Sequence, residues 1–412
     1  MAVGDVLVGL DIGFSDLNLV VTRVNDFNQL DILFSDSIKS KNFIKGMILD
    51  KDVVKKEIST VFKKIYDEHN LKIKSSYITI PGMYVDVQQR EIDINVSNPI
   101  KGITEEDVYR TIDDIRAKYT KTLYTDIEII PFKFISEDGR FLSNPVGITD
   151  KKVTMLAQII YGKNDYLDSI FDIFEELDLY VDGFIPVGLG EKEVFLTTKR
   201  NKNNIMLIDF NEYTIETSIF INDAIVKLDT LEIGTNVIPK MLSYNAEIDL
   251  NEAEKLVTKY PLALRSFIDN DNNILLKTSK SKDYNKRTIK TSHLVGITEE
   301  TLKKIFEKIN ESLVECGYKK LIDKIVLTGD INNIKQSDLL ATVVFNISVK
   351  NEYIKDYMPE NEKIFRTYGM LKYISKEKDF AYEYSSMVEQ IEETKTLKKI
   401  FKNIKDFFIH KI

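Results

Sequence analysis

The side chains with the clearest potential for chemistry are two aspartates about half a chain apart. Asp11 lies in a tight Asp-x-Gly turn between two apolar runs (7–24), and Asp209 lies in a polar turn between two more (205–221). Carboxylate oxygens at such turns can hold a divalent cation such as magnesium. Because apolar runs that flank a tight turn are typical of hairpins, the pattern predicts duplicated lobes whose hairpins face each other.

This arrangement resembles the actin-like superfamily, which includes sugar kinases and heat-shock chaperones. The resemblance implies an α/β fold of the actin-like (ribonuclease-H-like) kind, with two lobes and a cleft between them. In that family the two turns grip the phosphates of a nucleotide and its magnesium, and Asp11 and Asp209 would hold the metal only together with a nucleotide. The residues that would contact the cofactor are Asp11, Gly13, Ser15, Asp209, Thr214, Glu254 and Gly329.

Both turns depart from the pattern of the superfamily. Phe14 stands where a small hydroxyl residue is usual, and Asn18 stands where the family has a lysine. Residues 211–213 (Asn-Glu-Tyr) replace glycines that let phosphate approach the backbone, and residues 330–331 (Asp-Ile) replace glycines of the adenosine motif. We therefore expect no cofactor to bind tightly, with Mg-ATP as the ligand if the cleft is functional after all. The enzyme question stays open and leans towards no activity.

Composition narrows the class of protein. The chain has 412 residues with 43% hydrophobic and 30% charged residues and a net charge of −8, which is ordinary for a globular protein and argues against nucleic-acid binding. Cys316 stands alone and the three histidines lack ligand spacing, so neither a disulfide framework nor a histidine-based metal site is expected. With no signal peptide or spanning apolar run in the sequence, we expect a cytoplasmic protein.

Patterning and turn signals also predict individual elements. Asp50 or Asp52 is expected to cap one helix and Thr104 another, and residues 249–252 read as a capping box. Thr298 is expected to start a long helix, and a closing helix is expected over 365–375. The predicted division of the chain is lobe one (1A) at 1–82, 162–190 and 336–376; an inserted subdomain (1C) at 83–161; lobe two at 191–228 and 300–335 (2A) and at 229–299 (2B); an acidic linker at 377–393; and a terminal helix at 394–412.

Several local motifs, in order along the chain, are similar to the FtsA family of bacterial cell-division proteins. Residues 138–148 (Asp-Gly-Arg-Phe-Leu-Ser-Asn-Pro-Val-Gly-Ile) look like its Asp-Gly…Asn-Pro-x-Gly-Met segment, which closes the inserted 1C subdomain. Residues 231–238 resemble its Gly-Gly stretch, residues 253–254 its Ala-Glu helix, and residues 325–329 its Val-Leu-Thr-Gly strand. Each motif is weak alone, but together they cover nearly the whole chain.

The C-terminal segment 394–412 has the pattern of an amphipathic helix. Apolar residues recur at steps of three and four, and lysines occupy most of the remaining surface, which is typical of a helix that lies in a membrane interface. A helix docked on the protein's own body is the alternative. The expected membrane-binding residues are Leu397, Lys398, Ile400, Phe401, Lys402, Ile404, Lys405, Phe407, Phe408 and Ile412.

The family resemblance implies a tether in cell division. Such a protein would attach to anionic lipid on the inner face of the cell membrane at the division site. It would receive the FtsZ C-terminal peptide on 229–299 and assemble with itself through 83–161. The alternatives are a scaffold similar to PilM of pilus assembly, which lacks a terminal helix of this type, and an ATPase or sugar kinase of the same superfamily, which needs an intact phosphate clamp.

Overall fold

The computed structural model describes residues 4–13, 16–40, 42–44, 47–196, 204–276, 288–353 and 364–376. The expected acidic linker and amphipathic helix, with all the expected membrane-binding residues, lie outside these ranges, as do Phe14 and Ser15. Within the described part of the chain, every helix is too short or too polar to cross a bilayer.

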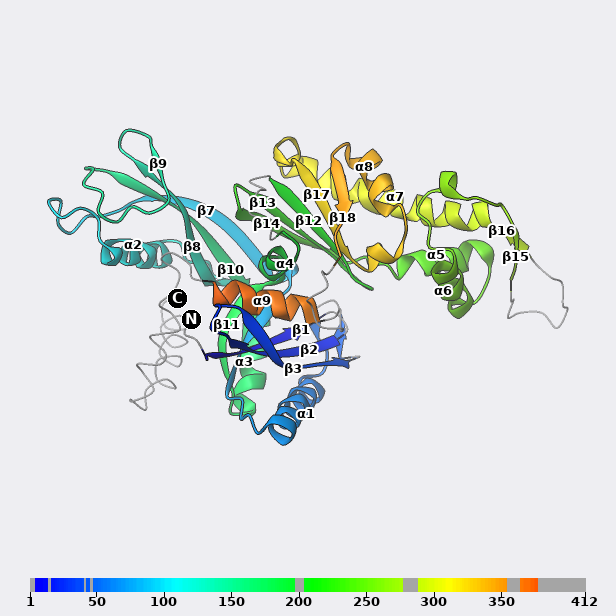
Figure 1. The fold of residues 1–412 in the computed structure, drawn as a ribbon, viewed down its shortest axis with the longest axis horizontal. Coiled ribbons are helices and arrows are strands. Elements are labelled where there is room, and N and C mark those ends of the chain that lie inside the picture. The colour runs from blue at the N-terminus through cyan, green and yellow to red at the C-terminus, as the bar shows by residue number, and fades with distance from the viewer. Residues whose placement is uncertain are drawn as a thin grey trace.

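Two five-stranded sheets repeat one topology, as the paired hairpins predicted (Figure 1). In each sheet, three antiparallel strands joined by hairpins are followed by two parallel strands on the side of the first hairpin strand. The first sheet, in spatial order, is β3 (Leu30–Lys39), β2 (Asp16–Val24), β1 (Val6–Ile12), β6 (Ser75–Ile80) and β11 (Tyr180–Pro186). The second is β14 (Ala224–Leu231), β13 (Ile215–Ile221), β12 (Ile205–Phe210), β17 (Lys324–Gly329) and β18 (Ser348–Asn351).

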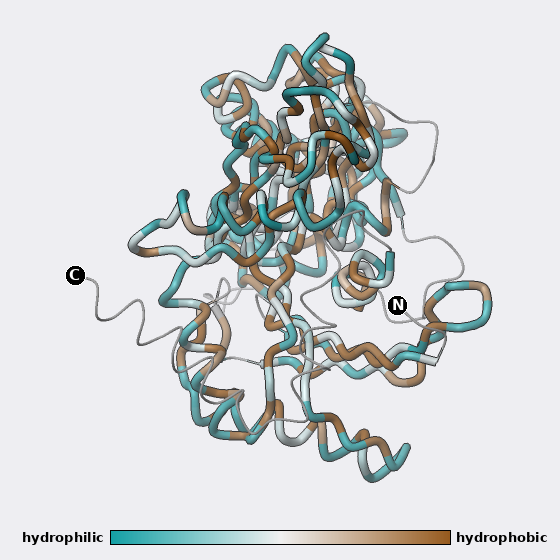
Figure 2. The backbone as a smooth tube through the Cα atoms, turned by 90° about the vertical axis from the view of Figure 1, so that its left-hand side faces the viewer, coloured by the Kyte–Doolittle hydropathy of each residue, from teal (hydrophilic) through white to brown (hydrophobic). Residues whose placement is uncertain are grey.

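Helices cover the outer face of each sheet. In lobe one, α1 (Lys51–His69) and α3 (Asn164–Glu176) bury apolar faces in one core with β1 and β2, and the Asp50 side chain caps α1 as predicted. In lobe two, α7 (Thr291–Glu315) and α8 (Ser337–Phe345) do the same against β12 and β17. Figure 2 shows hydrophilic and hydrophobic residues interspersed along much of the backbone.

Two helices fill the space between the lobes. They are α4 (Val187–Phe195), which follows β11, and α9 (Phe365–Ser375), whose bounds match the predicted closing helix. A Cβ on Gly369 would lie 2.2 Å from the Gly190 carbonyl oxygen, so the two helices cross almost backbone to backbone. A Cβ on Gly9 of β1 would lie 2.9 Å from a side-chain atom of Thr367, so α9 also rests directly on the first strand. The lobes share an apolar core here.

The insert forms a sheet of its own with a separate core. Thr104 and Asp107 form a reciprocal capping box at the start of its helix, which confirms the predicted cap. Its elements are β7 (Val85–Asp93), α2 (Glu105–Lys118), β8 (Tyr124–Ser136), β9 (Phe141–Leu142) and β10 (Val153–Lys163).

A smaller unit beyond the second sheet has a further core, to which the first turns of α7 contribute. Its other elements are α5 (Val237–Ala246), α6 (Leu250–Lys259), η2 (Arg265–Phe267), β15 (Asn273–Leu275) and β16 (Thr288–Lys290). The short elements elsewhere are β4 (Phe43–Ile44), β5 (Met47–Ile48), η1 (Gly82–Tyr84), η3 (Lys319–Leu321) and η4 (Asp330–Asn333).

Three sequence-based expectations need correction. Thr298 is buried inside α7, because Leu294 and Val295 pack into the core of the smaller unit and so extend the helix towards its N-terminus. The Asp249 side chain makes no cap bond at α6, where its backbone carbonyl accepts the first N–H groups instead. The boundary at residue 336 is also misplaced, since α8 packs in the core of the second lobe and β18 pairs with β17 in its sheet.

Candidate functional site

Asp11 lies at the end of β1, buried and fully engaged by neighbouring side chains. The Thr79 hydroxyl donates to its Oδ1, and the Asn18 amide donates to its Oδ2 at 3.2 Å. The side-chain oxygen of Asn18 in turn accepts a hydrogen bond from the Ser37 hydroxyl at 2.7 Å. Asn18, in the position where the superfamily has a lysine, is thus a fixed partner of Asp11.

Asp209 holds the equivalent place at the end of β12 and is fully buried. Its Oδ1 accepts from the Thr328 hydroxyl at 2.9 Å, and its Oδ2 accepts from the Asn211 amide at 3.2 Å and from the Arg366 guanidinium. Gly329 follows on β17 with φ +78°, and a Cβ there would lie 2.6 Å from Asp209 Oδ1. Only glycine fits this approach.

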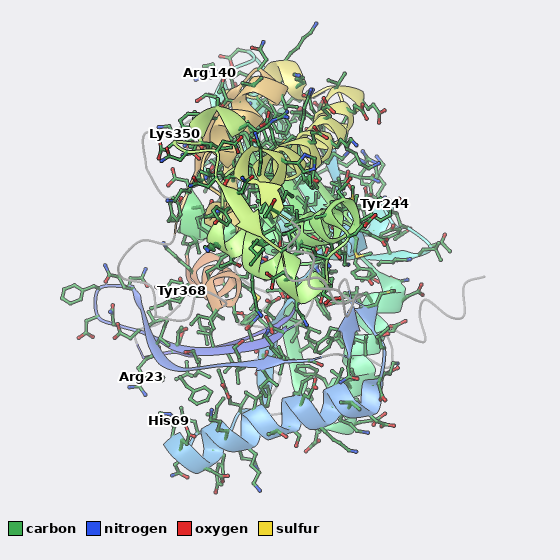
Figure 3. All side chains as sticks on the ribbon, turned by 90° about the vertical axis from the view of Figure 1, so that its right-hand side faces the viewer. Arg23, His69, Arg140, Tyr244, Lys350 and Tyr368 are labelled. Atoms are coloured by element: carbon green, nitrogen blue, oxygen red, sulfur yellow. The ribbon has the colours of Figure 1, made fainter. Side chains whose placement is uncertain are left out.

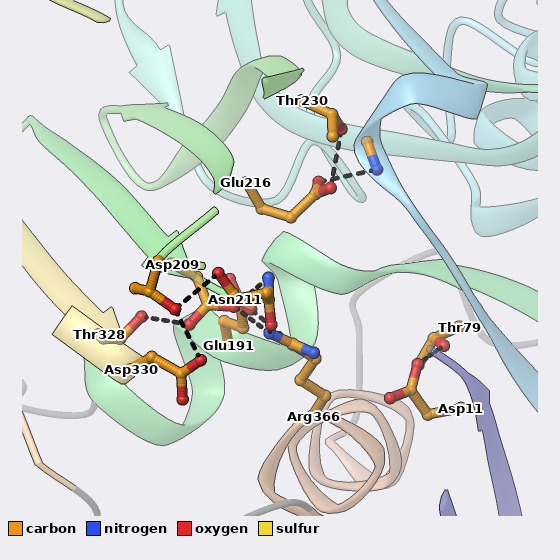
Figure 4. Close-up of polar contacts among 12 residues, drawn as sticks. Asp11, Thr79, Glu191, Asp209, Asn211, Glu216, Thr230, Thr328, Asp330 and Arg366 are labelled. Carbon is orange, nitrogen blue, oxygen red and sulfur yellow. Dashed lines mark hydrogen bonds and ion pairs between the residues drawn. The ribbon is translucent and has the colours of Figure 1, made fainter. Parts of the chain in front are cut away.

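Arg366 reaches from α9 to the hairpin of lobe two (Figure 4). Its guanidinium donates to Asp209 and to the Asn211 side-chain oxygen, and its Nε donates to Glu191 Oε1 of α4 at 3.2 Å. Burial opposes the charge, but attraction by Asp209, Glu191 and Asp11 outweighs it and raises the pKa of Arg366. A single cation therefore joins both connecting helices to the second hairpin.

Further carboxyl groups surround this cation. Burial, followed by repulsion from Asp209, raises the pKa of Glu191 well above its ordinary value, and its contact with Arg366 opposes that rise. Burial also raises the pKa of Glu216 to about 7. Asp330 has its pKa raised by burial and then by Asp209. Arg366 makes its direct ion pairs in this cluster with Asp209 and Glu191.

The backbone of the second turn is committed to bonds within lobe two. Asn211 N–H donates to the Thr214 carbonyl at 2.8 Å, which closes the turn. The N–H groups of Thr235 and Asn236 donate inwards to the carbonyls of Asn211 and Glu212 at 2.9 and 3.0 Å. These donors come from the stretch that resembles the family's Gly-Gly motif, and here they serve the turn itself.

The remaining predicted contact residues are placed as follows. Thr214 is fully buried in the second turn, and Gly13 donates its N–H to the Asp16 carbonyl at 2.9 Å, across from it in the first hairpin. Glu254 is exposed on α6. It contributes to the raised pKa of Tyr213, after the hydrogen bond that the Tyr213 hydroxyl donates to Glu212 and after burial. Ser15 lies outside the described residues.

The two aspartates do not fit a magnesium ion as they stand. Their oxygens are taken by Thr79 and Asn18 in one case and by Thr328, Asn211 and Arg366 in the other. Among the residues that the structure describes, no group of three or more His, Cys, Asp or Glu side chains is arranged to hold a metal. A cation bound at Asp209 Oδ2 would first have to displace Arg366.

Sequence reasoning missed Arg366 and Glu191. The available signal was their setting, since each is the charged residue of a short, otherwise uncharged helix segment (364–371 and 187–191). A charge there needs a buried partner. Arg366, however, pairs with Asp209, which lies 157 positions away in the sequence, and no local pattern reveals such a contact.

The duplicated sheets, the two connecting helices and the facing hairpins define an actin-like two-lobed protein, which confirms the predicted fold class. The solved structure of the PilM–PilN type IV pilus biogenesis complex aligns with a TM-score of 0.56 and 11% sequence identity, covering 92% of this chain and 98% of that one. No family model matches the sequence.

Curated proteins that are similar in sequence narrow the comparison to FtsA. The FtsA cell-division protein of Buchnera aphidicola subsp. Baizongia pistaciae is 24% identical over 355 residues, which is 84% of this chain and 83% of the relative. That of Enterococcus faecalis is 23% identical over 373 residues, 89% of this chain and 82% of the relative. The chain is therefore a homologue of FtsA proteins from several species, and the resemblance seen in its motifs is confirmed.

Proposed function

We propose that this chain is an actin-like cell-division protein that tethers FtsZ filaments to the inner face of the cell membrane and assembles with itself. The similarity to FtsA proteins, over more than four fifths of both chains, is the observation that carries the proposal. The separate sheet formed within 83–161 supports it, since an inserted 1C subdomain is expected at this position.

The smaller unit of lobe two is the proposed receiver of the FtsZ C-terminal peptide. It presents exposed apolar side chains, among them Tyr244 on α5, which is 80% exposed (Figure 3), and Phe267 in η2. Arg265 lies over Gly296 of α7, where a Cβ would be 3.2 Å from its Cδ, and its Nε pairs with Glu299 at 3.2 Å. An arginine from η2 thus lies on the surface of α7.

Weak or absent nucleotide binding is part of the proposal. Four carboxyl groups surround Arg366, those of Asp209, Glu191, Glu216 and Asp330. A triphosphate at this position would be repelled by ionised carboxylates, and the Arg366 guanidinium is already paired with Asp209 and Glu191. The N–H groups of Thr235 and Asn236 already donate to carbonyls of the second turn, so they are not available to bind phosphate. Titration calorimetry with Mg-ATP tests this point, and binding at micromolar concentration would contradict it.

Co-sedimentation tests the tether. The full chain should pellet with anionic vesicles, carry a labelled FtsZ C-terminal peptide into that pellet, and lose both on deletion of 394–412. Phe401→Asp with Phe408→Asp should release it, because burial of apolar side chains is lost. Thr396→Asp with Asn403→Asp, off the apolar stripe, makes the same charge change and should retain most binding.

Peptide-binding measurements distinguish the proposed function from its alternatives. Arg265→Ala with Phe267→Ala should weaken binding of the FtsZ peptide about tenfold or more, in line with loss of a pair of interface anchors. A PilN peptide that binds while the FtsZ peptide does not would favour the PilM-like scaffold. Turnover of ATP, with or without a sugar acceptor, would favour the enzyme. A truncated chain that still pellets with vesicles would remove the tail as the anchor.

A further inference from the structure

Arg366 is an unusual side chain in this protein. Among the described residues it is the one lysine or arginine that is buried, with 9% of its surface exposed. A buried guanidinium is costly unless its charge is paired and its donors are satisfied. Here it donates to Asp209, Asn211 and Glu191. These partners compensate the burial of its charge only when both lobes are in contact.

The helix that carries Arg366 is fixed in position by backbone packing. Gly369 lies against Gly190 of α4, and Thr367 and Met370 lie against Gly9 of β1. The backbone of α9 therefore belongs with the first lobe, while its guanidinium pairs with the second hairpin. A change in the angle between the lobes would pull Arg366 away from Asp209.

The site of contact is also significant. Arg366 feels attraction from both hairpin aspartates, Asp209 directly and Asp11 at longer range. These are the two carboxylates whose placement on facing hairpins predicted a magnesium ion. A protein-borne cation therefore pairs directly with one of these carboxylates and attracts the other.

We propose that Arg366 is a built-in cation that replaces magnesium and nucleotide as the link between the lobes, so that the lobes stay closed without a ligand. The proposal deepens the proposed function and rests on its weak nucleotide site. Removal of the side chain would leave Asp209, Glu191 and Asn211 with oxygens turned towards a vacated cation position, and such oxygens suit a guanidinium ion or a divalent metal.

The experiment uses the full chain and compares Arg366→Ala, Arg366→Lys and a control, Arg265→Ala, which removes an exposed arginine from an ion pair with Glu299. Melting temperature is measured alone, with methylguanidinium and with Mn²⁺, and bound Mn²⁺ is counted by electron paramagnetic resonance. Removing one partner of a buried ion pair is strongly destabilising, so Arg366→Ala should melt about 6–10 °C lower. The control should shift by less than about 2 °C.

Methylguanidinium at millimolar concentration should restore at least half of that loss in Arg366→Ala and leave the wild type and the control unchanged. Mn²⁺ should bind Arg366→Ala at least tenfold more tightly than the wild type. If Arg366→Ala does not fold, Arg366→Lys decides: an intermediate melting temperature supports the link, and a wild-type one overturns it. Unchanged melting of Arg366→Ala, or a loss that neither cation restores, overturns the proposal. Mg-ATP binding by the wild type would instead overturn the weak nucleotide site.

Discussion

At the scale of single residues, Glu216 shows how the closed arrangement depends on protonation. Its carboxyl group, on β13, accepts from Gly82 N–H at 3.0 Å, where the insert begins, and from the Thr230 hydroxyl at 2.8 Å. Burial raises its pKa to about 7, with Asp209 adding to the rise and Arg366 opposing it. The folded state therefore prefers the protonated acid.

This preference gives a pH dependence of definite sign. The pKa of Glu216 is about 7 in the folded protein and 4.5 as its ordinary value. Protonation of Glu216 therefore stabilises the folded state fully below pH 4.5, and this stabilisation is lost as pH rises through 7. Glu216→Gln, an isostere of the neutral acid, should remove roughly 1–3 kcal/mol of that decline in the free energy of unfolding. Denaturant melts at pH 5 and pH 8 measure it, with the exposed Glu137→Gln as control. Equal slopes in Glu216→Gln and wild type would contradict the assignment.

At the scale of elements, the crossing of α4 and α9 sets how close the lobes can come. Glycines at the contact let the helix backbones touch, and this brings Arg366 within reach of Glu191 on the neighbouring helix. A larger residue would separate the helices and weaken the contacts of the guanidinium as well. Backbone contact, rather than side-chain interdigitation, is what makes this junction specific.

Gly369→Ala tests that contact. Alanine normally favours a helix by about 1 kcal/mol over glycine, but here its Cβ would lie 2.2 Å from the Gly190 carbonyl oxygen. We expect a net loss of about 2 kcal/mol or more in the free energy of unfolding, in the range for overpacking. The control is Gly296→Ala in α7, where the Cβ meets the flexible Arg265 side chain at 3.2 Å and little or no loss is expected. Chemical denaturation of both variants decides, and similar losses would refute the argument.

At the scale of the whole molecule, the first lobe is built from distant parts of the chain. Its sheet comes from the first 80 residues and β11, while one of its covering helices, α9, comes from 365–375. The second lobe, from β12 to β18, is continuous apart from its smaller unit. The two ends of the described chain are therefore parts of one folded body.

Two truncations separate folding from attachment. A chain ending at Lys376 keeps every described element and should melt like the full protein, while vesicle binding is lost. A chain ending at residue 363 lacks α9, which uncovers Gly9 and leaves Asp209 without its guanidinium. It should lose cooperative melting and bind a hydrophobic dye. Circular dichroism melts with vesicle sedimentation distinguish the two, and a stable, cooperative 363-residue chain would contradict this account.

The two hairpins and the closing helix were predictable from sequence because their signals are local: apolar runs, turn residues and a short periodic helix. The site was predictable only in part. Asp11 and Asp209 were found from their turns, and the lost glycines pointed to a changed chemistry. Arg366 was not found, because its role depends on a contact between segments that meet only in the folded protein.

The position of α9 also affects how the protein is made. During synthesis, β1 leaves the ribosome first, but the helix that rests on Gly9 appears only after the whole second lobe. Domains generally fold as units in the order of their emergence, so the second lobe can be complete while the first still exposes the bare face of its sheet. The lobe that is begun first is the last to be finished.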